Sequence, residues 1–223
     1  MRVRTLRAAG ALAGGAALAG YATVIRPWML GWGATDEEVR GALPGDDVIK
    51  QPRYQATHAV TVHAPIADVW PWLVQIGQGR GGLYSYDRLE NLFGLGFHST
   101  DRIVPELQHL GIGDQVWMVP RDASVPMYFQ VLDVKPPTVL VLGPHGDPAE
   151  AYEQGLPWSS WTFVLRDRGD ATTRLIARLR ADFKPTAAGL LVNKYGLEPV
   201  HFLMERKMLL GIRQRAELAG ASA

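Results

Sequence analysis

Hydrophobic and polar side chains alternate most regularly between residues 158 and 183. Two sets of side chains alternate along the second half of this stretch, Leu175, Ala177, Leu179 and Ala181 against Arg174, Ile176, Arg178 and Arg180. A period of two predicts a β-strand with one buried face and one face in solvent. The turn residues 167–170 separate this strand, at residues 172–183, from another at residues 158–166. The pattern therefore predicts an antiparallel hairpin.

The remaining elements follow from shorter patterns. Runs of β-prone residues predict four more strands, at residues 54–63, 114–119, 127–134 and 138–142. Apolar residues at helical spacing predict a helix over residues 65–76, in which Pro71 predicts a kink. The glycine-rich residues 77–82 separate it from a second short helix predicted at residues 86–93. The order is one strand, two helices and then a series of antiparallel strands.

The longest helical pattern in the chain covers residues 198–219. Pro199 suits its first turn, where a missing backbone N–H costs nothing. At about 1.5 Å per residue the helix would span roughly 33 Å, the width of a small domain. Apolar residues surround most of it, so we expect a curved antiparallel sheet to wrap around the helix. The predicted fold class is α+β, with space between sheet and helix for an apolar molecule.

Three motifs in this order resemble those of one superfamily. They are residues 64–73 (APIADVWPWL), Gly113-Asp114 at the start of a strand, and residues 202–209 (FLMERKML). Over about residues 55–218 the chain resembles the START-related helix-grip superfamily (SRPBCC), which includes lipid-transfer, pollen-allergen-like and polyketide cyclase/dehydrase proteins. The resemblance implies a hydrophobic ligand held between the sheet and the C-terminal helix. Only some members are enzymes, and no catalytic set of a member matches this sequence.

The first 30 residues predict attachment to a membrane. Three arginines among the first seven residues precede an uncharged run at residues 8–25, of which 12 are Ala or Gly. Arginines on the N-terminal side of such a run favour a single-pass anchor with its N-terminus inside and the domain outside the cytoplasm. Two alternatives stay open. One is a signal peptide cleaved at Ala17-Leu18-Ala19, which would give a secreted protein, and the other is a helix lying on a surface.

Residues 31–53 predict a linker between this segment and a helix-grip domain at residues 54–223. Within the linker, Thr35 followed by Glu38 predicts a capping box and a short helix at residues 36–43. The rest of the linker predicts a loop that crosses to the domain.

Composition narrows the classes of function. The 223-residue chain has a formal charge of +1, which gives no case for nucleic-acid binding, because that requires a concentrated basic face. It contains no cysteine, which excludes disulfides and cysteine-bound zinc. Its six histidines show no metal-binding spacing, and no phosphate-binding fingerprint is present, so we expect neither a metal nor a cofactor. The sequence leaves the oligomeric state open.

Inward strand positions and the last helix supply candidates for lining the space between sheet and helix. The candidate ligand-binding residues are Trp117, Tyr128, Trp161, Phe163, Met204 and Met208. Aromatic rings and flexible methionine side chains suit an apolar ligand, and they suit an ordinary hydrophobic core equally well. Both interpretations stay open for each of these residues.

Three residues are candidates for proton transfer. His201 and Glu205 lie four residues apart beside the apolar row of the last helix, where a buried pair can act as a general base or bind a polar head group. His98, followed by Asp101, can act as an acid or base at the mouth of the cavity. The structural alternatives are a satisfied or rim ion pair and a capped, solvated turn. His58 is interpreted as a core or edge histidine.

Two functions follow from these observations. The first is binding or carrying of a hydrophobic small molecule, lipid-like or polyketide-like, at a membrane surface. The alternative is a cyclase or dehydratase that uses histidine and carboxylate groups in the cavity. A third and weaker hypothesis is a membrane-tethered interaction domain without a ligand. Convergence of a histidine and a carboxylate inside the cavity would separate the second function from the first.

Overall fold

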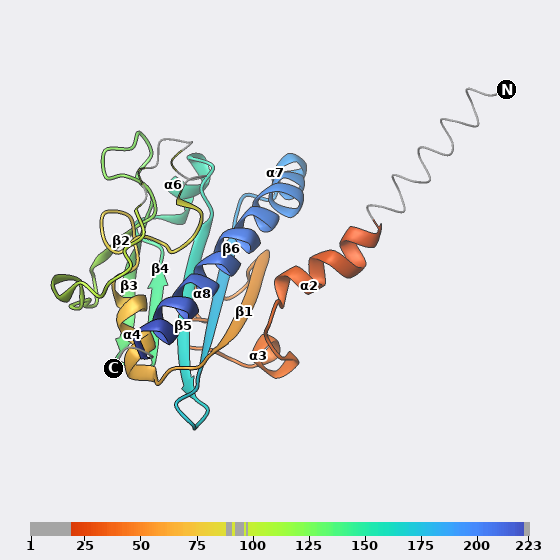
Figure 1. Cartoon of the computed structure of the whole chain (residues 1–223). Helices are drawn as coiled ribbons and strands as arrows, with labels where there is room; N and C mark the ends of the chain where they lie inside the picture. Colours follow the sequence, from red (N-terminus) through yellow and green to blue (C-terminus); the bar gives the residue numbers. More distant parts are fainter. Residues whose placement is uncertain (1–18, 88–90, 92–95, 97, 221–223) are drawn as a thin grey trace.

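The structure is a computed structural model that describes residues 19–87, 91, 96 and 98–220. Its centre is one antiparallel sheet of six strands in the order β1-β6-β5-β4-β3-β2. The strands are β1 (Tyr54–Val62), β2 (Gln115–Trp117), β3 (Tyr128–Lys135), β4 (Val139–Gly143), β5 (Trp158–Asp167) and β6 (Thr173–Asp182). The long helix α8 (Glu198–Gly220) crosses one face of this sheet (Figure 1). The fold is α+β with the predicted helix-grip arrangement.

Shorter helices connect and flank the strands. They are η1 (Tyr21–Ile25), α2 (Arg26–Leu30), α3 (Asp36–Arg40), α4 (Ile66–Val74), η2 (Pro105–Leu107), α6 (Pro148–Glu153), α7 (Ala187–Val192) and η3 (Asn193–Leu197). The sequence pattern predicted α3, α4 and α8 but missed α6 and α7, because one or two turns are too short to show a helical period. The second helix predicted after β1, residues 86–93, lies mostly outside the described residues.

The main hydrophobic core lies between the sheet and the helices α4 and α8. The residues that α8 buries include Phe202, Glu205, Met208, Leu209, Ile212 and Ala216. These positions form one stripe, and on other sides of the helix Val200 and Leu203 are 51% and 52% exposed. The expectation that the sheet surrounds most of the helix is therefore wrong. A sheet that covers a helix from one side contacts a single stripe of it.

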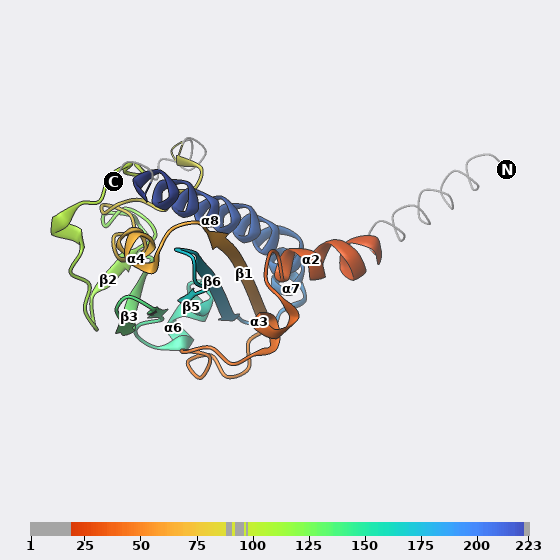
Figure 2. The same ribbon diagram turned by 60° about the horizontal axis from the view of Figure 1, so that its bottom comes forward.

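The second face of the sheet is covered by residues 31–53, here called the strap (Figure 2). The predicted linker is thus packed along the sheet. Its helix α3 begins at the predicted capping box, in which the Thr35 side chain accepts from the Glu38 N–H and the Glu38 side chain accepts from the Thr35 N–H. Val164 and Ile176 on this face pack with Leu43 of the strap in a second, smaller hydrophobic cluster.

Three arginines of β6 hold the strap against the sheet. Arg174 donates to both carboxylate oxygens of Glu38, at 2.8 and 2.7 Å. Arg178 donates to Asp46 at 2.7 Å and to three strap carbonyls, and Arg180 donates to the Ile49 carbonyl at 3.0 Å. The alternation on β6 is as predicted, but the face expected in solvent is buried. The strap supplies carboxylates and carbonyls, and their hydrogen bonds to the guanidinium groups compensate for the cost of burying these charges.

The glycine-rich residues 77–82 form a tight reversal after α4. Gly77 and Gly82 pair in an isolated antiparallel bridge. Gly82 has a φ of +82°, and a Cβ atom there would lie 2.6 Å from the Cα of Ser99. The backbone of residues 98–99 therefore packs directly on this glycine, and a larger residue has no room.

Residues 19–30 form a helical segment that lies beside the beginning of α8 (Figure 2). Among the residues that the structure describes, no helix is long and apolar enough to cross a membrane. Only the last seven residues of the predicted anchor, residues 8–25, belong to the described part of the chain. The predicted membrane helix is thus without support in the structure, and most of it lies outside the described residues.

Candidate functional site

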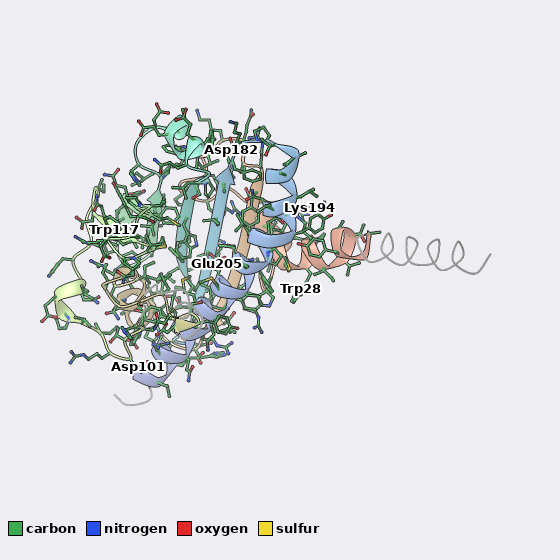
Figure 3. The ribbon with its side chains drawn as sticks, turned by 90° about the horizontal axis from the view of Figure 1, so that it is seen from above. Trp28, Asp101, Trp117, Asp182, Lys194 and Glu205 are labelled. Atoms are coloured by element: carbon green, nitrogen blue, oxygen red, sulfur yellow. The ribbon has the colours of Figure 1, made fainter. Side chains whose placement is uncertain are left out.

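A group of polar side chains lies between the sheet and α8, in surroundings that are otherwise largely apolar. We call it the polar cluster: Tyr54 and His58 of β1, Trp161 of β5, and His201 and Glu205 of α8. The strand period of two turns both β1 residues toward α8, and the i, i+4 spacing stacks both α8 residues on one side of the helix. Figure 3 shows Glu205 on α8 over the sheet. The structure thus joins two predicted catalytic candidates, His201 and Glu205, with His58, which was interpreted as a core or edge histidine.

The Glu205 carboxylate lies at the centre of the polar cluster. One of its oxygens accepts a hydrogen bond from His58 Nδ1, and the other accepts from Trp161 Nε1. His201 Nε2 lies 3.6 Å from this second oxygen. Burial alone would raise the pKa of Glu205, but the neighbouring His201 and His58 hold it well below its usual range. Glu205 is therefore a buried carboxylate that stays ionised.

Both ring nitrogens of His58 face hydrogen-bond acceptors. Nδ1 faces the Glu205 carboxylate, and Nε2 lies 2.8 Å from the carbonyl oxygen of Met29 in α2. Because neither acceptor can donate, the ring carries a proton on each nitrogen. Burial works against this charge, but the carboxylate and the hydrogen bonds raise the pKa of His58 above its ordinary value. His58 and Glu205 form a buried ion pair that also fixes the end of the N-terminal helical segment.

His201 extends the cluster toward the surface. Its Nδ1 lies 2.8 Å from the Tyr54 hydroxyl, while its Nε2 is buried and makes no hydrogen bond within the described part of the chain. Burial and the nearby Glu205 charge raise the pKa of Tyr54, so its hydroxyl remains protonated and can donate to His201. The His201 side chain is 21% exposed, against 1% for Glu205. His201 is therefore the most exposed member of the cluster, although its Nε2 atom is buried beside Glu205.

The predicted ligand-binding residues divide into two groups. Trp161, Phe163 and Met208 lie in the core between the sheet and α8. Met204 is half-buried on α8, and its carbonyl accepts a hydrogen bond from Ser85 Oγ. That these residues bind a ligand stays a prediction.

Trp117 and Tyr128 form the second group. They are register partners in β2 and β3, and their ring centroids are 4.7 Å apart. Their strand neighbours Val116 and Phe129 point into the main core, so both rings lie on the opposite side of the sheet from α8. Figure 3 shows Trp117 away from Glu205. The inward position expected for these two residues is therefore wrong, while their binding of a ligand stays a prediction.

A pocket of about 160 Å³ opens at the end of the sheet near α6. Most of its wall comes from proline and apolar side chains, which include Pro126, Met127, Tyr128, Phe129, Leu156 and Trp158. His145 stacks on Tyr128 with ring centroids 3.6 Å apart, and it contributes a polar edge to the wall. We call this space the α6 pocket. Tyr128 is the predicted ligand-binding residue that lines it.

Two aromatic rings connect the α6 pocket with the polar cluster. Phe129 lines the pocket and lies 6.0 Å, between ring centroids, from Trp161. Trp161 in turn donates its indole N–H to Glu205. A molecule in the pocket is thus separated from the Glu205 carboxylate by these two side chains. Because the rings are packed together, a substitution of either one would alter the packing at both sites.

His98 lies apart from the polar cluster, and it is exposed. Asp101, which was expected to orient it, forms an ion pair of 2.6 Å with Arg215 of α8. Ser99 bonds to Asp87 through its N–H and its hydroxyl, at 2.6 and 2.7 Å. The ion pair attaches the segment after the glycine-rich loop to α8, and the Ser99 bonds hold it to Asp87. The role of His98 as an acid or base stays a prediction.

The sequence interpretation did not assign His58 to a functional site. The available signal was its register on β1, because His58 shares a face of that strand with Val60 and Val62 and so points toward α8. The α6 pocket left no signal, because residues 126–159 join a strand, a hairpin and a short helix that meet only in the fold. Among the described residues, no group of three or more His, Asp or Glu side chains is placed to hold a metal ion.

The chain was compared with family models, curated proteins and solved structures. No family model and no curated protein matches it. Solved structures that resemble it include a Mesorhizobium loti protein with 16% identity and a TM-score of 0.40, covering 74% of this chain and 98% of its own. Truncated norcoclaurine synthase from Thalictrum flavum has 14% identity, a TM-score of 0.42 and coverages of 72% and 91%. A Nitrosomonas europaea protein has 13% identity, a TM-score of 0.44 and coverages of 79% and 99%. At these values the comparisons assign no activity to the chain.

Proposed function

We propose that this protein binds a small apolar molecule in the α6 pocket. The observation that carries the proposal is a pocket of about 160 Å³ whose wall is mainly proline, aromatic and aliphatic. An apolar cavity of about 150 Å³ is large enough to hold benzene. The pocket therefore suits a single ring, or the end of a longer lipid-like or polyketide-like molecule that extends into solvent.

Polar groups at the pocket give such a ligand an orientation. His145, Glu150, Gln154 and Ser159 contribute to the lining among the apolar side chains. A few polar groups in an apolar pocket are typical of small-molecule sites, where they fix one end of the ligand. A ring with one hydroxyl or carbonyl group fits this distribution better than a plain hydrocarbon.

Saturation-transfer NMR with p-cresol as the probe tests the proposal. Ala151 lines the pocket from α6, so Ala151→Phe should fill it and abolish the transfer signal. Ala149 lies on the same helix but is exposed and outside the lining, so Ala149→Phe is the matched control and should retain the signal. Equal signals from both variants, or no signal from the parent protein, would overturn the proposal. Native mass spectrometry of protein from its own host would then search for the natural ligand.

A second candidate function is proton-transfer catalysis of the cyclase or dehydratase kind. The observation that favours it is the convergence of His58, His201, Glu205 and Tyr54 between the sheet and α8. In such a reaction His201 would take or give the proton at Nδ1, in place of its hydrogen bond to Tyr54, and the ionised Glu205 beside Nε2 would stabilise the charged imidazole that forms. The cluster is separated from the α6 pocket by aromatic side chains, so this function requires a substrate that approaches from the exposed side of His201.

Deuterium uptake from D₂O into 2-indanone, a ketone with acidic C–H groups, tests this candidate. The protein should accelerate the uptake, and His201→Gln should remove the acceleration while the protein remains folded. Ala151→Phe should leave the exchange rate unchanged if the reaction uses the polar cluster without the pocket. Exchange at the uncatalysed rate with the parent protein argues for a structural role of the cluster.

A further inference from the structure

Exposed apolar side chains gather at one corner of the molecule, where the N-terminal helical segment meets the beginning of α8. They belong to η1, α2, α7, η3 and the first turns of α8. They include Val24, Trp28, Leu191, Val192, Leu197 and Leu203, with exposed fractions between 51% and 66%. We call this surface the apolar face. Exposed clusters of this kind mark a contact with a partner or a membrane more often than isolated exposed leucines do.

Direct contacts make the apolar face one continuous surface. The Tyr21 hydroxyl donates to the Lys194 carbonyl at 2.6 Å, and the Tyr21 and Tyr195 rings lie 5.2 Å apart. Trp28 packs edge-on against Phe202 at 5.3 Å. Figure 3 shows Trp28 and Lys194 on the same side of the molecule. The N-terminal segment and the α7–α8 segment therefore present their exposed side chains together.

The charges of this corner are arranged so that it lacks free negative charge. Glu198 is the only acidic residue between residues 184 and 204, and it is 5% exposed. Its two carboxylate oxygens bond to Arg26 at 2.6 and 2.9 Å. Lys194 lies over the Tyr195 ring, with its amino group 5.5 Å from the ring centroid. Tyrosine, tryptophan and lysine side chains around aliphatic ones are the combination found where proteins meet the head groups of a lipid bilayer.

The sequence before residue 19 favours a lipid bilayer over other partners for the apolar face. The structure is described from residue 19 onward, and Tyr21 already lies in the apolar face. Residues 8–18, which lead into it, contain only Ala, Gly and Leu, and Arg2, Arg4 and Arg7 precede them. Uncharged residues after a basic group favour the head-group region and the hydrocarbon edge of an anionic membrane. An uncharged segment thus enters the domain at its most apolar exposed corner.

We propose that the apolar face lies in the head-group region of a lipid bilayer and orients the domain on the membrane. The contact uses side chains of α7, η3 and α8 as well as the N-terminal segment, so it does not depend on whether residues 8–18 span the bilayer. Trp158 of β5 and Asp182 of β6 are register partners, and α6 and α7 lie just beyond this end of the hairpin (Figure 1). The apolar face and the proposed α6 pocket therefore lie at the same end of the sheet.

The absence of cysteine allows a direct test on the full chain. In Leu191→Cys and, separately, Leu203→Cys, the new thiol is labelled with the environment-sensitive dye NBD. Vesicles of phosphatidylcholine and phosphatidylglycerol in equal amounts are then added. The emission should shift to the blue and rise several-fold at both positions, and lipids that carry a quencher at the head-group level should reduce it. Ile112, which is 71% exposed before β2 at the other edge of the sheet, is the matched control, and its label should not respond.

Each other outcome would overturn the proposal. Binding of the protein to vesicles without a response at positions 191 and 203 would mean that the N-terminal residues alone hold it. A response at all three positions would mean unspecific insertion. A response that appears without lipid and grows with protein concentration would mean that a second copy of the chain covers the face. Equal thermal unfolding of the labelled variants and the parent confirms that the fold is intact.

Discussion

Glu205 and His58 form an ion pair that is buried between α8 and β1, although they are 147 residues apart in the chain. Removing one partner of such a pair leaves the other charge buried and uncompensated, at a cost of about 3–5 kcal/mol. We therefore expect Glu205→Gln to lower the free energy of unfolding in urea by an amount of this order. Asp36, an exposed carboxylate paired with Arg40, is the control, and Asp36→Asn should cost less than about 0.5 kcal/mol. Equal losses of unfolding free energy in the two variants would show that the buried pair contributes no more to stability than an exposed one.

The stabilisation from this pair should depend on pH with a defined window. The pKa of Glu205 is lowered on folding from 4.5, so its contribution is present above that value and is lost as pH falls through the folded pKa. The pKa of His58 is raised from 6.5, so its contribution is complete below that value and is lost as pH rises through the folded pKa. The difference in unfolding free energy between the parent and Glu205→Gln should thus be largest between pH 4.5 and pH 6.5. Urea titrations in this range and in alkaline buffer measure it, and a difference that grows toward alkaline pH would contradict the assignment.

Arg178 holds the strap against the sheet through several hydrogen bonds at once. Its guanidinium group is 2% exposed and donates to Thr57, to Asp46 and to three strap carbonyls. Arg178→Ala leaves these acceptors buried, so we expect a loss of about 3–5 kcal/mol and faster amide hydrogen exchange in the strap. Arg213→Ala, at an exposed arginine of α8, should change neither quantity. Unchanged exchange in the strap of the Arg178 variant would mean that the hydrophobic contacts of Leu43 suffice.

The glycine-rich loop offers a test of close packing with a control in the same loop. Gly79→Ala and Gly82→Ala both place a Cβ on a residue of positive φ, at a cost of about 1–2 kcal/mol. A Cβ at Gly79 meets nothing within 4 Å, whereas at Gly82 it meets the Ser99 backbone at 2.6 Å. Thermal unfolding should therefore show a clearly larger loss of stability for Gly82→Ala. Equal losses would indicate that residues 98–99 move away from the loop without cost.

The elements of the fold follow from local patterns in the sequence. The predicted strands at residues 54–63 and 158–166 correspond to β1 (Tyr54–Val62) and β5 (Trp158–Asp167), and the last helix differs from α8 by a single residue. Strand alternation and a capped run of helix formers act over neighbouring residues, so one sequence suffices to show them. For the same reason the sequence could predict that His201 and Glu205, four residues apart, lie beside the apolar row of α8.

The partners of these elements were decided by the tertiary structure alone. The alternation on β6 shows that Arg174 and Arg178 share a face, but not that Glu38 and Asp46 would come from the strap to bury them. His58 could be placed on the inner face of β1 but not beside Glu205, because that contact depends on the position at which α8 crosses the sheet. Local sequence determines which way a side chain points. Which group it meets depends on segments that lie more than a hundred residues away, and the period of a single element carries no record of them.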